Sequence, residues 1–232
     1  GNIAKRVPDR APDYFVLDIP RDQVDEFETL VRNADPGASW RMVPALRGSV
    51  LAFGSEGAMT RTADLDEIPD GAWALRGERG LTYADRLPEG NELTEGTWWG
   101  PMYAGEPLVS VDEDFADAAG LKVGDMLTFG VLGVERTARI ANLRRIDWES
   151  MGFNYVFVLS PNALQDAPHN LAATVELSQG TPTGPLLQSL VAALPSTSVI
   201  EVGGVLEQAR TILEQVGFAT LAAASVAVLA GL

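Results

Sequence analysis

Nucleophilic catalysis needs an activated side chain beside a base, and this sequence offers few candidates for either role. The Gly-x-Ser-x-Gly elbow of many hydrolases is absent, because Gly54, Ser55 and Gly57 have the wrong spacing. The chain has no cysteine and a single histidine, His169, in the stretch DAPHNLAA. His169 is either an imidazole base, which requires two more convergent groups, or a turn residue bonded to the backbone. We expect the second.

Metal and phosphate chemistry have no better support. Asp112, Glu113 and Asp114 are three adjacent carboxylates. They open an expected helix, where the helix dipole favours negative charge, and no EF-hand spacing follows them. Gly203 and Gly204 precede another expected helix, without the further glycines and the lysine of a P-loop. The sequence therefore predicts no catalytic residue, no metal and no cofactor, and ATP chemistry would belong to another chain.

One polar cluster is a candidate for binding. The stretch LRRIDWES carries Arg144, Arg145, Asp147 and Trp148 just before an apolar strand. The arginines could hold a carboxylate or a phosphate of a partner. Alternatively, one of them could pair with Asp147 internally, with the tryptophan as a lid that locks two lobes together. We favour the internal pair.

An aromatic patch is the second candidate for binding. In GTWWGPMYAG, Trp98 and Trp99 are followed by Met102 and Tyr103. Neighbouring residues of a strand point to opposite faces of the sheet, so we expect one tryptophan in the core and the other at the surface. An exposed aromatic side chain there would suit a partner or an apolar cargo.

Composition limits the class of partner. The 232 residues include 17 basic and 32 acidic side chains, a formal net charge of −15. This charge repels phosphate backbones, so nucleic acid is not an expected partner. The absence of cysteine excludes disulfides. GNIAKRVPDRAPD, at the amino end, has no apolar signal-peptide core, so export would depend on a segment outside this sequence.

The spacing of apolar residues predicts an α+β fold. YFVLDIP is typical of a strand, RDQVDEFETLVRNADPG of a helix, and WRMVPALRGSVLAF of a strand interrupted by Pro44 and Gly48. LAATVELS, PLLQSLVAAL and SVIEV repeat the order strand, helix, strand late in the chain. Two such units in one sheet would form a split βαβ layer of ferredoxin-like type.

A mostly β lobe is expected between these two units, after a polar connection at 55–71. One helix should interrupt it, because Ser110 and Glu113 have capping-box spacing and Gly120 can end the helix. VERTARIANLRRID predicts a long exposed strand. FNYVFVLSP is apolar on both faces and predicts a central strand.

The end of the chain has a different character. Apolar residues recur there at helical spacing and predict an amphipathic stalk helix: Val205, Leu206, Ala209, Ile212, Leu213 and Val216. The stretch VGFATLAAASVAVLAGL that follows carries no charge. Its length alone fits either a core helix or the beginning of a transmembrane helix.

Several long motifs resemble one protein family. They are WALRGERGLTYADRLPEGNELTEGTWWG, PLVSVDEDFADAAGLKVGDMLTF and ARIANLRRIDWESMGFNYVFVLSPNAL, with VPALRGSV and APHNLAATVEL. These residues resemble the first extracytoplasmic domain of YbbP-like ABC transporter permeases, within the FtsX, MacB and LolC/LolE permease superfamily. The resemblance extends over nearly the whole chain.

The resemblance implies a domain organisation and a location. It implies a porter-like α/β subdomain at 11–70 and 153–202 and an inserted, mostly β, Sabre-like subdomain at 73–150. Residues 203–232 would form the stalk helix and the start of a transmembrane helix. The domain would lie on the periplasmic side of the inner (cytoplasmic) membrane, as part of a permease and without enzyme activity.

The resemblance also implies partners. ATP would be hydrolysed by a separate YbbA-like ATPase subunit, and the permease would transmit that movement to this domain. A periplasmic lysophospholipase or thioesterase-like hydrolase and a hydrophobic or lipid-like cargo would be its other partners.

Two alternatives remain open from the sequence. The first is a soluble periplasmic esterase, which would place a Ser or Asp within hydrogen-bond reach of His169 in an open cleft. The second is an FtsX-like module that binds and activates a cell-wall hydrolase.

Overall fold

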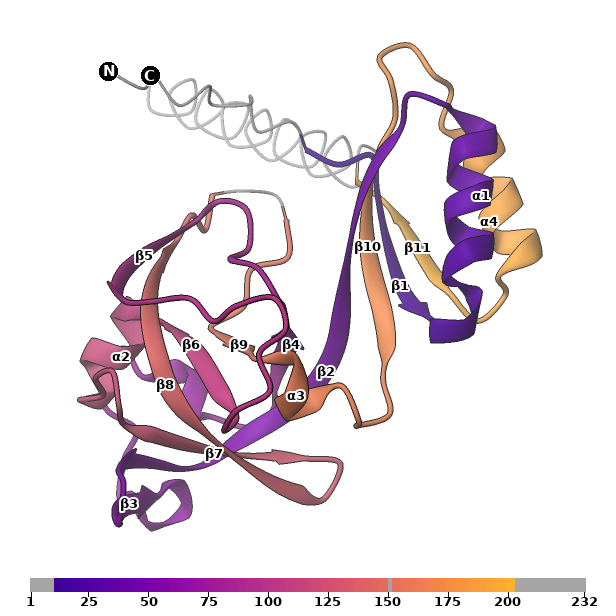
Figure 1. Cartoon of the computed structure of the whole chain (residues 1–232). Coiled ribbons are helices and arrows are strands. Elements are labelled where there is room, and N and C mark those ends of the chain that lie inside the picture. Colours follow the sequence, from indigo (N-terminus) through magenta and orange to yellow (C-terminus); the bar gives the residue numbers. More distant parts are fainter. Residues whose placement is uncertain (1–10, 150–151, 203–232) are drawn as a thin grey trace, which may run out of the picture.

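The computed structural model describes residues 11–149 and 152–202 (Figure 1). The predicted stalk helix, with Val205, Leu206, Ala209, Ile212, Leu213 and Val216, and the predicted start of a membrane helix lie outside the described residues. Within the described ranges, no helix is both long and apolar enough to cross a membrane.

Four strands and two helices form the first part of the molecule. The unit β1 (Tyr14–Ile19), α1 (Val24–Ala34) and β2 (Ser39–Ser55) comes first, with a 3-10 turn at Arg21–Gln23 before α1. The second unit is β10 (Asn170–Glu176), α4 (Gly184–Ala193) and β11 (Ser198–Glu201). The strand order β11-β1-β10-β2, antiparallel throughout, is that of a ferredoxin-like layer. The predicted pairing of two βαβ units is therefore confirmed.

Both helices lie side by side on one face of this layer (Figure 1). Phe27 and Val31 of α1 and Leu186 and Leu190 of α4 are buried, because the apolar residues of each helix recur on one side. They pack with the inward residues of β1 and β10 in a hydrophobic cluster of their own. We call this part the layered lobe, residues 11–45 and 168–202.

The second part is built mostly of strands. It contains β3 (Ala58–Arg61), β4 (Arg79–Tyr83), β5 (Asn91–Gly96), β6 (Leu108–Asp112), β7 (Met126–Val131), β8 (Val134–Ile146) and β9 (Phe157–Leu159). Its helical elements are the 3-10 turns Thr62–Asp64 and Trp73–Leu75 and the helices α2 (Glu113–Ala119) and α3 (Pro161–Leu164). We call this part the β lobe, residues 46–149 and 152–167.

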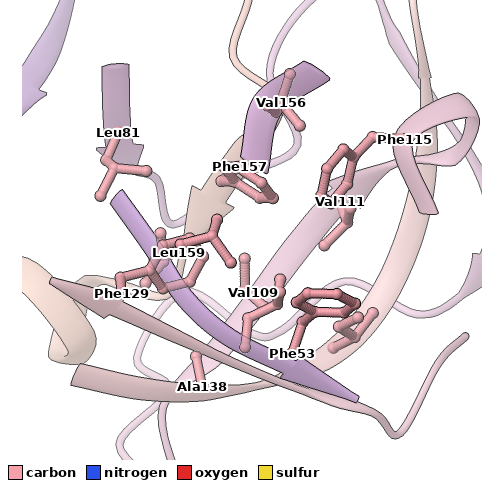
Figure 2. Close-up of a cluster of buried hydrophobic side chains, with 14 of the residues drawn as sticks. Phe53, Leu81, Val109, Val111, Phe115, Phe129, Ala138, Val156, Phe157 and Leu159 are labelled. Carbon is pink, nitrogen blue, oxygen red and sulfur yellow. The ribbon is translucent and has the colours of Figure 1, made fainter. Parts of the chain in front are cut away.

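The β lobe has its own core. Figure 2 shows Phe115, Phe129 and Phe157 converging among valine and leucine side chains from several strands. The ring centroid of Phe157 lies 5.1 Å from those of both Phe115 and Phe129, in edge contacts. β9 is short, fully buried and placed between β4 and β6, as its two apolar faces predicted.

One long strand joins the two lobes. β2 pairs with β10 over Ser39–Ala45, then with β4 over Leu46–Gly48 and with β7 from Ser49 onward. The expected interruption at Pro44 and Gly48 is therefore wrong. The carbonyl oxygen of Pro44 accepts a hydrogen bond of 2.7 Å from the Thr82 hydroxyl.

Gly48 is a site of close approach and not a break. A Cβ at this position would lie 2.7 Å from Leu81 Cδ1 and 2.8 Å from the carbonyl oxygen of Gly130. Only glycine allows β4 and β7 to pack this closely around β2.

Three smaller expectations are corrected in the β lobe. Asp112, and not Ser110, caps α2: its carboxylate accepts from the Phe115 N–H, and Gly120 ends the helix in the left-handed region at φ 70°. β8 is largely buried along its second half and is not an exposed strand. The polar connection contains β3, which forms a hairpin with β2.

Candidate functional site

Arg144 lies at the centre of the predicted polar cluster, and its side chain is fully buried. Its Nε donates to Asn91 Oδ1 at 3.0 Å, and its Nη1 donates to the carbonyl oxygens of Ser110 and Val156 at 3.3 and 3.2 Å. Its Nη2 donates to the carbonyl oxygen of Tyr155. The guanidinium thus ties β5, β6 and the segment before β9 together inside the β lobe.

The electrostatics of this site follow from burial. Burial lowers the pKa of Arg144 to about 10, and the nearby Asp112 carboxylate acts in the opposite direction. The pKa of Asp112 is raised, chiefly by burial, although the Phe115 N–H and Arg144 favour its charged form. A buried arginine with carbonyl and carboxylate neighbours is a structural support, because its N–H groups are already directed at the protein.

The other three residues of the cluster lie nearer the surface. Arg145 pairs with Glu113 at 3.2 Å and with Glu92 at 3.9 Å. The Asp147 carboxylate accepts from the Glu149 N–H at 3.1 Å. Trp148 is 47% exposed. Arg144 and Arg145 are therefore held by partners of the β lobe and do not reach across to the layered lobe through these contacts.

The expectation that one tryptophan lies in the core is confirmed by Trp99, but the alternation of the two side chains across a strand is wrong. Trp98 and Trp99 follow β5 in irregular backbone and stack on each other, with ring centroids 4.1 Å apart, so they do not point to opposite faces of a strand. Trp99 is buried and its indole donates to the Ala84 carbonyl oxygen at 2.8 Å. Trp98 is half-buried and donates to the Asp85 carbonyl oxygen at 3.1 Å.

The rest of the patch forms an exposed loop. Met102 is 92% exposed, and the Tyr103 hydroxyl donates to the Glu106 carbonyl oxygen at 2.7 Å. The predicted patch therefore comprises two tryptophans with tilted, adjacent rings, a partly buried Tyr103 and a highly exposed Met102. Thioether side chains adapt to varied apolar surfaces, so Met102 can contact a partner or cargo without large rearrangement.

The two lobes contact each other through residues that the sequence did not predict as a group. Next to the Pro44 and Thr82 hydrogen bond, Tyr83 Oη lies 2.9 Å from His169 Nε2. His169 Nδ1 lies 2.6 Å from the Ala167 carbonyl oxygen, which can only accept. In the neutral imidazole the proton is therefore on Nδ1, and Nε2 accepts from the Tyr83 hydroxyl.

Two further contacts extend this junction. Arg41 of β2 forms an ion pair with Glu89 of the β lobe. Phe15 of β1 meets Phe153 edge-on, with ring centroids 5.5 Å apart. We call Phe15, Arg41, Pro44, Thr82, Tyr83, Glu89, Phe153 and His169 the junction. No local motif marks these residues, since each contact joins positions far apart in the chain.

The geometry of His169 bears on the esterase alternative. Among the described residues, the hydrogen bonds recorded for its ring go to a phenol hydroxyl and a backbone carbonyl, and the ring packs edge-on against Tyr83 at 5.3 Å. These are not the Ser or Asp contacts that the esterase alternative requires. His169 is a junction residue in this arrangement.

Comparison with known proteins gives the class of protein first: the chain is similar to an ABC transporter permease. That relative is the uncharacterized ABC transporter permease YbbP of Escherichia coli (strain K12), 26% identical over 204 residues, or 88% of this chain. The chain spans 23% of the length of that permease. The sequence resemblance to YbbP-like permeases is thereby confirmed.

The chain was also compared with protein-family models and with solved structures. No family model matches the chain. A crystal structure described as "a domain of a putative Permease protein from Porphyromonas gingivalis" aligns with 75% of this chain and 81% of that one, at 14% identity and a TM-score of 0.40.

Proposed function

We propose that this chain is the periplasmic domain of an inner-membrane ABC transporter permease and has no enzyme activity of its own. The observation that carries the proposal is the 26% identity to YbbP over 88% of the chain. A separate YbbA-like ATPase subunit would supply the energy.

We further propose that the domain transmits movement from the membrane as one stiff body. β2 supports this, because its 17 residues form one strand through both lobes, with a register shift between Val50 and Ala52. At about 3.3 Å per residue its length along the chain is roughly 55 Å, and the strand bends where it passes from one lobe to the other (Figure 1). Arg41 and Pro44 of β2 and His169 beside β10 each contact the β lobe, and these contacts would carry a displacement of the layered lobe into it.

The packing also suggests where the porter-like and Sabre-like subdomains meet. We propose that the boundary lies within β2 near residue 45 and again near residue 168, instead of near residues 70 and 153. The support is that Trp40 and Met42 pack in the core of the layered lobe, whereas Leu46 and Val50 pack in that of the β lobe.

Met102, Tyr103 and the stacked Trp98 and Trp99 are the proposed contact for a hydrophobic or lipid-like cargo or for a periplasmic lysophospholipase or thioesterase-like hydrolase. The 92% exposure of Met102, close in sequence to the partly buried rings of Trp98 and Tyr103, supports this choice. The FtsX-like alternative, activation of a cell-wall hydrolase, would use the same kind of surface.

Cysteine labelling tests the location. The 232 residues contain no cysteine, so Val191→Cys, at a position 58% exposed on α4, gives this domain a single thiol. In intact cells that make the whole permease, we expect a membrane-impermeant maleimide that enters the periplasm to label it. Labelling only after lysis of the inner membrane would contradict a periplasmic location.

Distance measurements test the stiff-body mechanism. Spin labels at Val191→Cys in the layered lobe and Leu132→Cys in the β lobe sit on exposed side chains of the two lobes. In the assembled transporter we expect one narrow distance distribution that ATP does not change. A distribution that shifts or broadens on ATP addition would show that the lobes move separately.

A nucleotide test addresses the absence of enzyme activity. We expect the purified chain neither to bind nor to hydrolyse ATP, and measurable turnover by it would contradict the proposal.

A further inference from the structure

Two exposed tryptophans, Trp73 and Trp148, meet on the surface of the β lobe. Trp148 belongs to the predicted polar cluster, whereas Trp73 belongs to neither predicted site. Trp73 is 46% exposed and Trp148 is 47% exposed. Their ring centroids lie 6.4 Å apart at an interplanar angle of 65°. Beside Trp73 is a hollow of about 210 Å³ lined by Ile68, Pro69, Asp70, Gly71, Trp73 and Arg76. We call these residues with Trp148 the tryptophan surface.

Trp73 is held in place before any partner arrives. The Arg79 guanidinium lies over its ring, 4.8 Å from the centroid, and Arg79 Nη2 donates to the Trp73 carbonyl oxygen at 3.0 Å. A pre-oriented indole loses little conformational freedom on binding, so more of its contact energy contributes to affinity. Tryptophan is also the residue most typical of strongly contributing positions in protein interfaces.

Several carboxylates lie on one side of the tryptophan surface. Asp64, Asp66, Glu67 and Asp70 are all exposed on the segment that leads into the hollow. Gly71 touches α2, since a Cβ there would lie 3.1 Å from the Ala118 Cβ. This contact brings the segment beside α2, which exposes two more carboxylates.

The additional carboxylates are those of Asp114 and Asp117. Within residues 11–149 and 152–202, none of these six side chains takes part in an ion pair. Arg76 and Arg79 beside Trp73 offset only part of this charge. Asp70 lines the hollow itself, and the other five carboxylates lie on the segment that leads to it or on the neighbouring helix α2, so this side of the tryptophan surface carries a net negative charge.

The charge decides between classes of partner. An acidic surface repels nucleic acid and anionic lipid headgroups, whereas it attracts lysine and arginine side chains and speeds their encounter. Exposed indoles add apolar contact, and the Arg79 guanidinium over Trp73 is already one example of a cation on such a ring face. A protein segment that combines basic with apolar side chains satisfies both features, and an apolar cargo alone would satisfy only one.

We propose that the tryptophan surface binds an extended, basic segment of a protein partner, whose apolar side chains enter the hollow beside Trp73 and whose lysines or arginines meet the surrounding carboxylates. The proposal does not depend on the transport function. It concerns a face of the β lobe other than the Met102 patch.

Two synthetic peptides of opposite charge test the proposal on the full chain. The first repeats Lys-Pro-Leu, which favours an extended backbone, and the second has Glu in place of each Lys. Binding is followed through the indole N–H signals of the ¹⁵N-labelled protein, assigned with Trp73→Phe and Trp148→Phe. We expect the Lys peptide to shift the Trp73 and Trp148 signals and the Glu peptide to shift neither. Equal shifts with both peptides, or none with the Lys peptide, would overturn the proposal.

Substitutions separate local from general charge effects. Asp66→Asn, Glu67→Gln and Asp70→Asn together should weaken binding of the Lys peptide about fivefold. Trp73→Ala should weaken it about tenfold or more. The matched control combines Asp22→Asn, Asp25→Asn and Glu26→Gln in the layered lobe, which changes the net charge equally and should leave binding unchanged.

An equal loss in the control would show that the peptide senses only net charge and would overturn the proposal. Because Trp73→Ala removes a half-exposed side chain, thermal melting of each variant verifies its fold. Trp73→Phe keeps an aromatic ring and provides a second, gentler variant that should weaken binding less.

Discussion

The two lobes are stabilised by different kinds of buried side chain. The core of the layered lobe is almost entirely apolar, and among its described residues Asp35 is the only buried polar or charged one. The β lobe also has an apolar core, but it buries Thr82, Ser110, Asp112, Asp125, Thr128, Asn142, Arg144 and Ser160 as well.

This difference follows from how each lobe is connected. In the layered lobe, helices cover one face of antiparallel strands, and the backbone groups pair along neighbouring strands. In the β lobe, β4 pairs in parallel with β9 and β6 with β8, and irregular segments such as the one before β9 enter the interior. Arg144 donates to carbonyl groups of this segment, at Tyr155 and at Val156, which also accepts from the Asp112 N–H.

Loss of Arg144 should have the largest effect. Arg144→Met would leave the carbonyl oxygens of Ser110, Tyr155 and Val156 without this donor and the buried Asp112 without its cation. We expect the free energy of unfolding to fall by about 3 kcal/mol or more, measured by urea denaturation. Arg145→Met is the matched control, and because Arg145 is exposed it should cost less than about 1 kcal/mol. Similar losses of stability for both variants would show that the buried Arg144 stabilises the β lobe no more than an exposed arginine does. The contrast between the two lobes in their buried polar side chains would then have no consequence for stability.

Gly48→Ala should come second. The added methyl group would collide with Leu81 and with the Gly130 backbone, and the backbone cannot move aside without loss of β2 pairing. We expect a loss of about 2 kcal/mol in the same assay. Gly184→Ala at the start of α4, where no atom lies within 4 Å, should be neutral or stabilising. If Gly48→Ala left the free energy of unfolding unchanged, β4 and β7 would have room to move away from β2, and the close packing at Gly48 would be contradicted.

Tyr83→Phe tests the junction between the lobes. It removes the hydroxyl that bonds to His169 and keeps the ring, so we expect a loss of about 1 kcal/mol and faster amide exchange at Leu171 in β10. Tyr103→Phe makes the same chemical change in an exposed loop and should leave exchange in β10 unaltered. Unchanged exchange in both variants would mean that the junction does not couple the lobes.

Alkaline pH should affect the β lobe through Tyr155. Burial raises the pKa of Tyr155 to about 12, and its ring lies against Gly80. The tyrosine ionises near pH 10 in the unfolded chain, so folded-state stability is full below about pH 10 and declines as the pH rises towards 12.

We expect the wild type to lose about 1 kcal/mol more than Tyr155→Phe between about pH 9 and about pH 11, after allowance for the partial exposure of the ring. Urea denaturation at the two pH values measures the difference. Identical pH dependence in the two proteins would contradict a buried, neutral Tyr155.

Local signals made the layered lobe predictable. The spacing of Phe27 and Val31, the turn residues after α1 and the repeated order of strand, helix and strand each depend on neighbours in the sequence. The match to YbbP likewise depended on contiguous motifs.

The β lobe was less predictable because long-range contacts override its local patterns. Ser110 has the spacing of a helix cap, yet its hydroxyl bonds to Asn142 on β8 and Asp112 takes the cap. Arg144 has the sequence environment of an exposed arginine, and its burial depends on strands distant in the chain. The junction was missed for the same reason, since His169 alone gives no indication of Tyr83.

The partner change along β2 has a consequence for the order of folding. Its first half pairs with β10, so that Ala45 meets Asn170, and the whole β lobe lies between these two residues in sequence. Closing so long a loop of unfolded chain is entropically costly, and a β lobe that has already folded shortens it. We therefore expect β1, α1 and the first half of β2 to complete their sheet only after the second unit, β10 to β11, has been synthesised, and the β lobe between them to fold first.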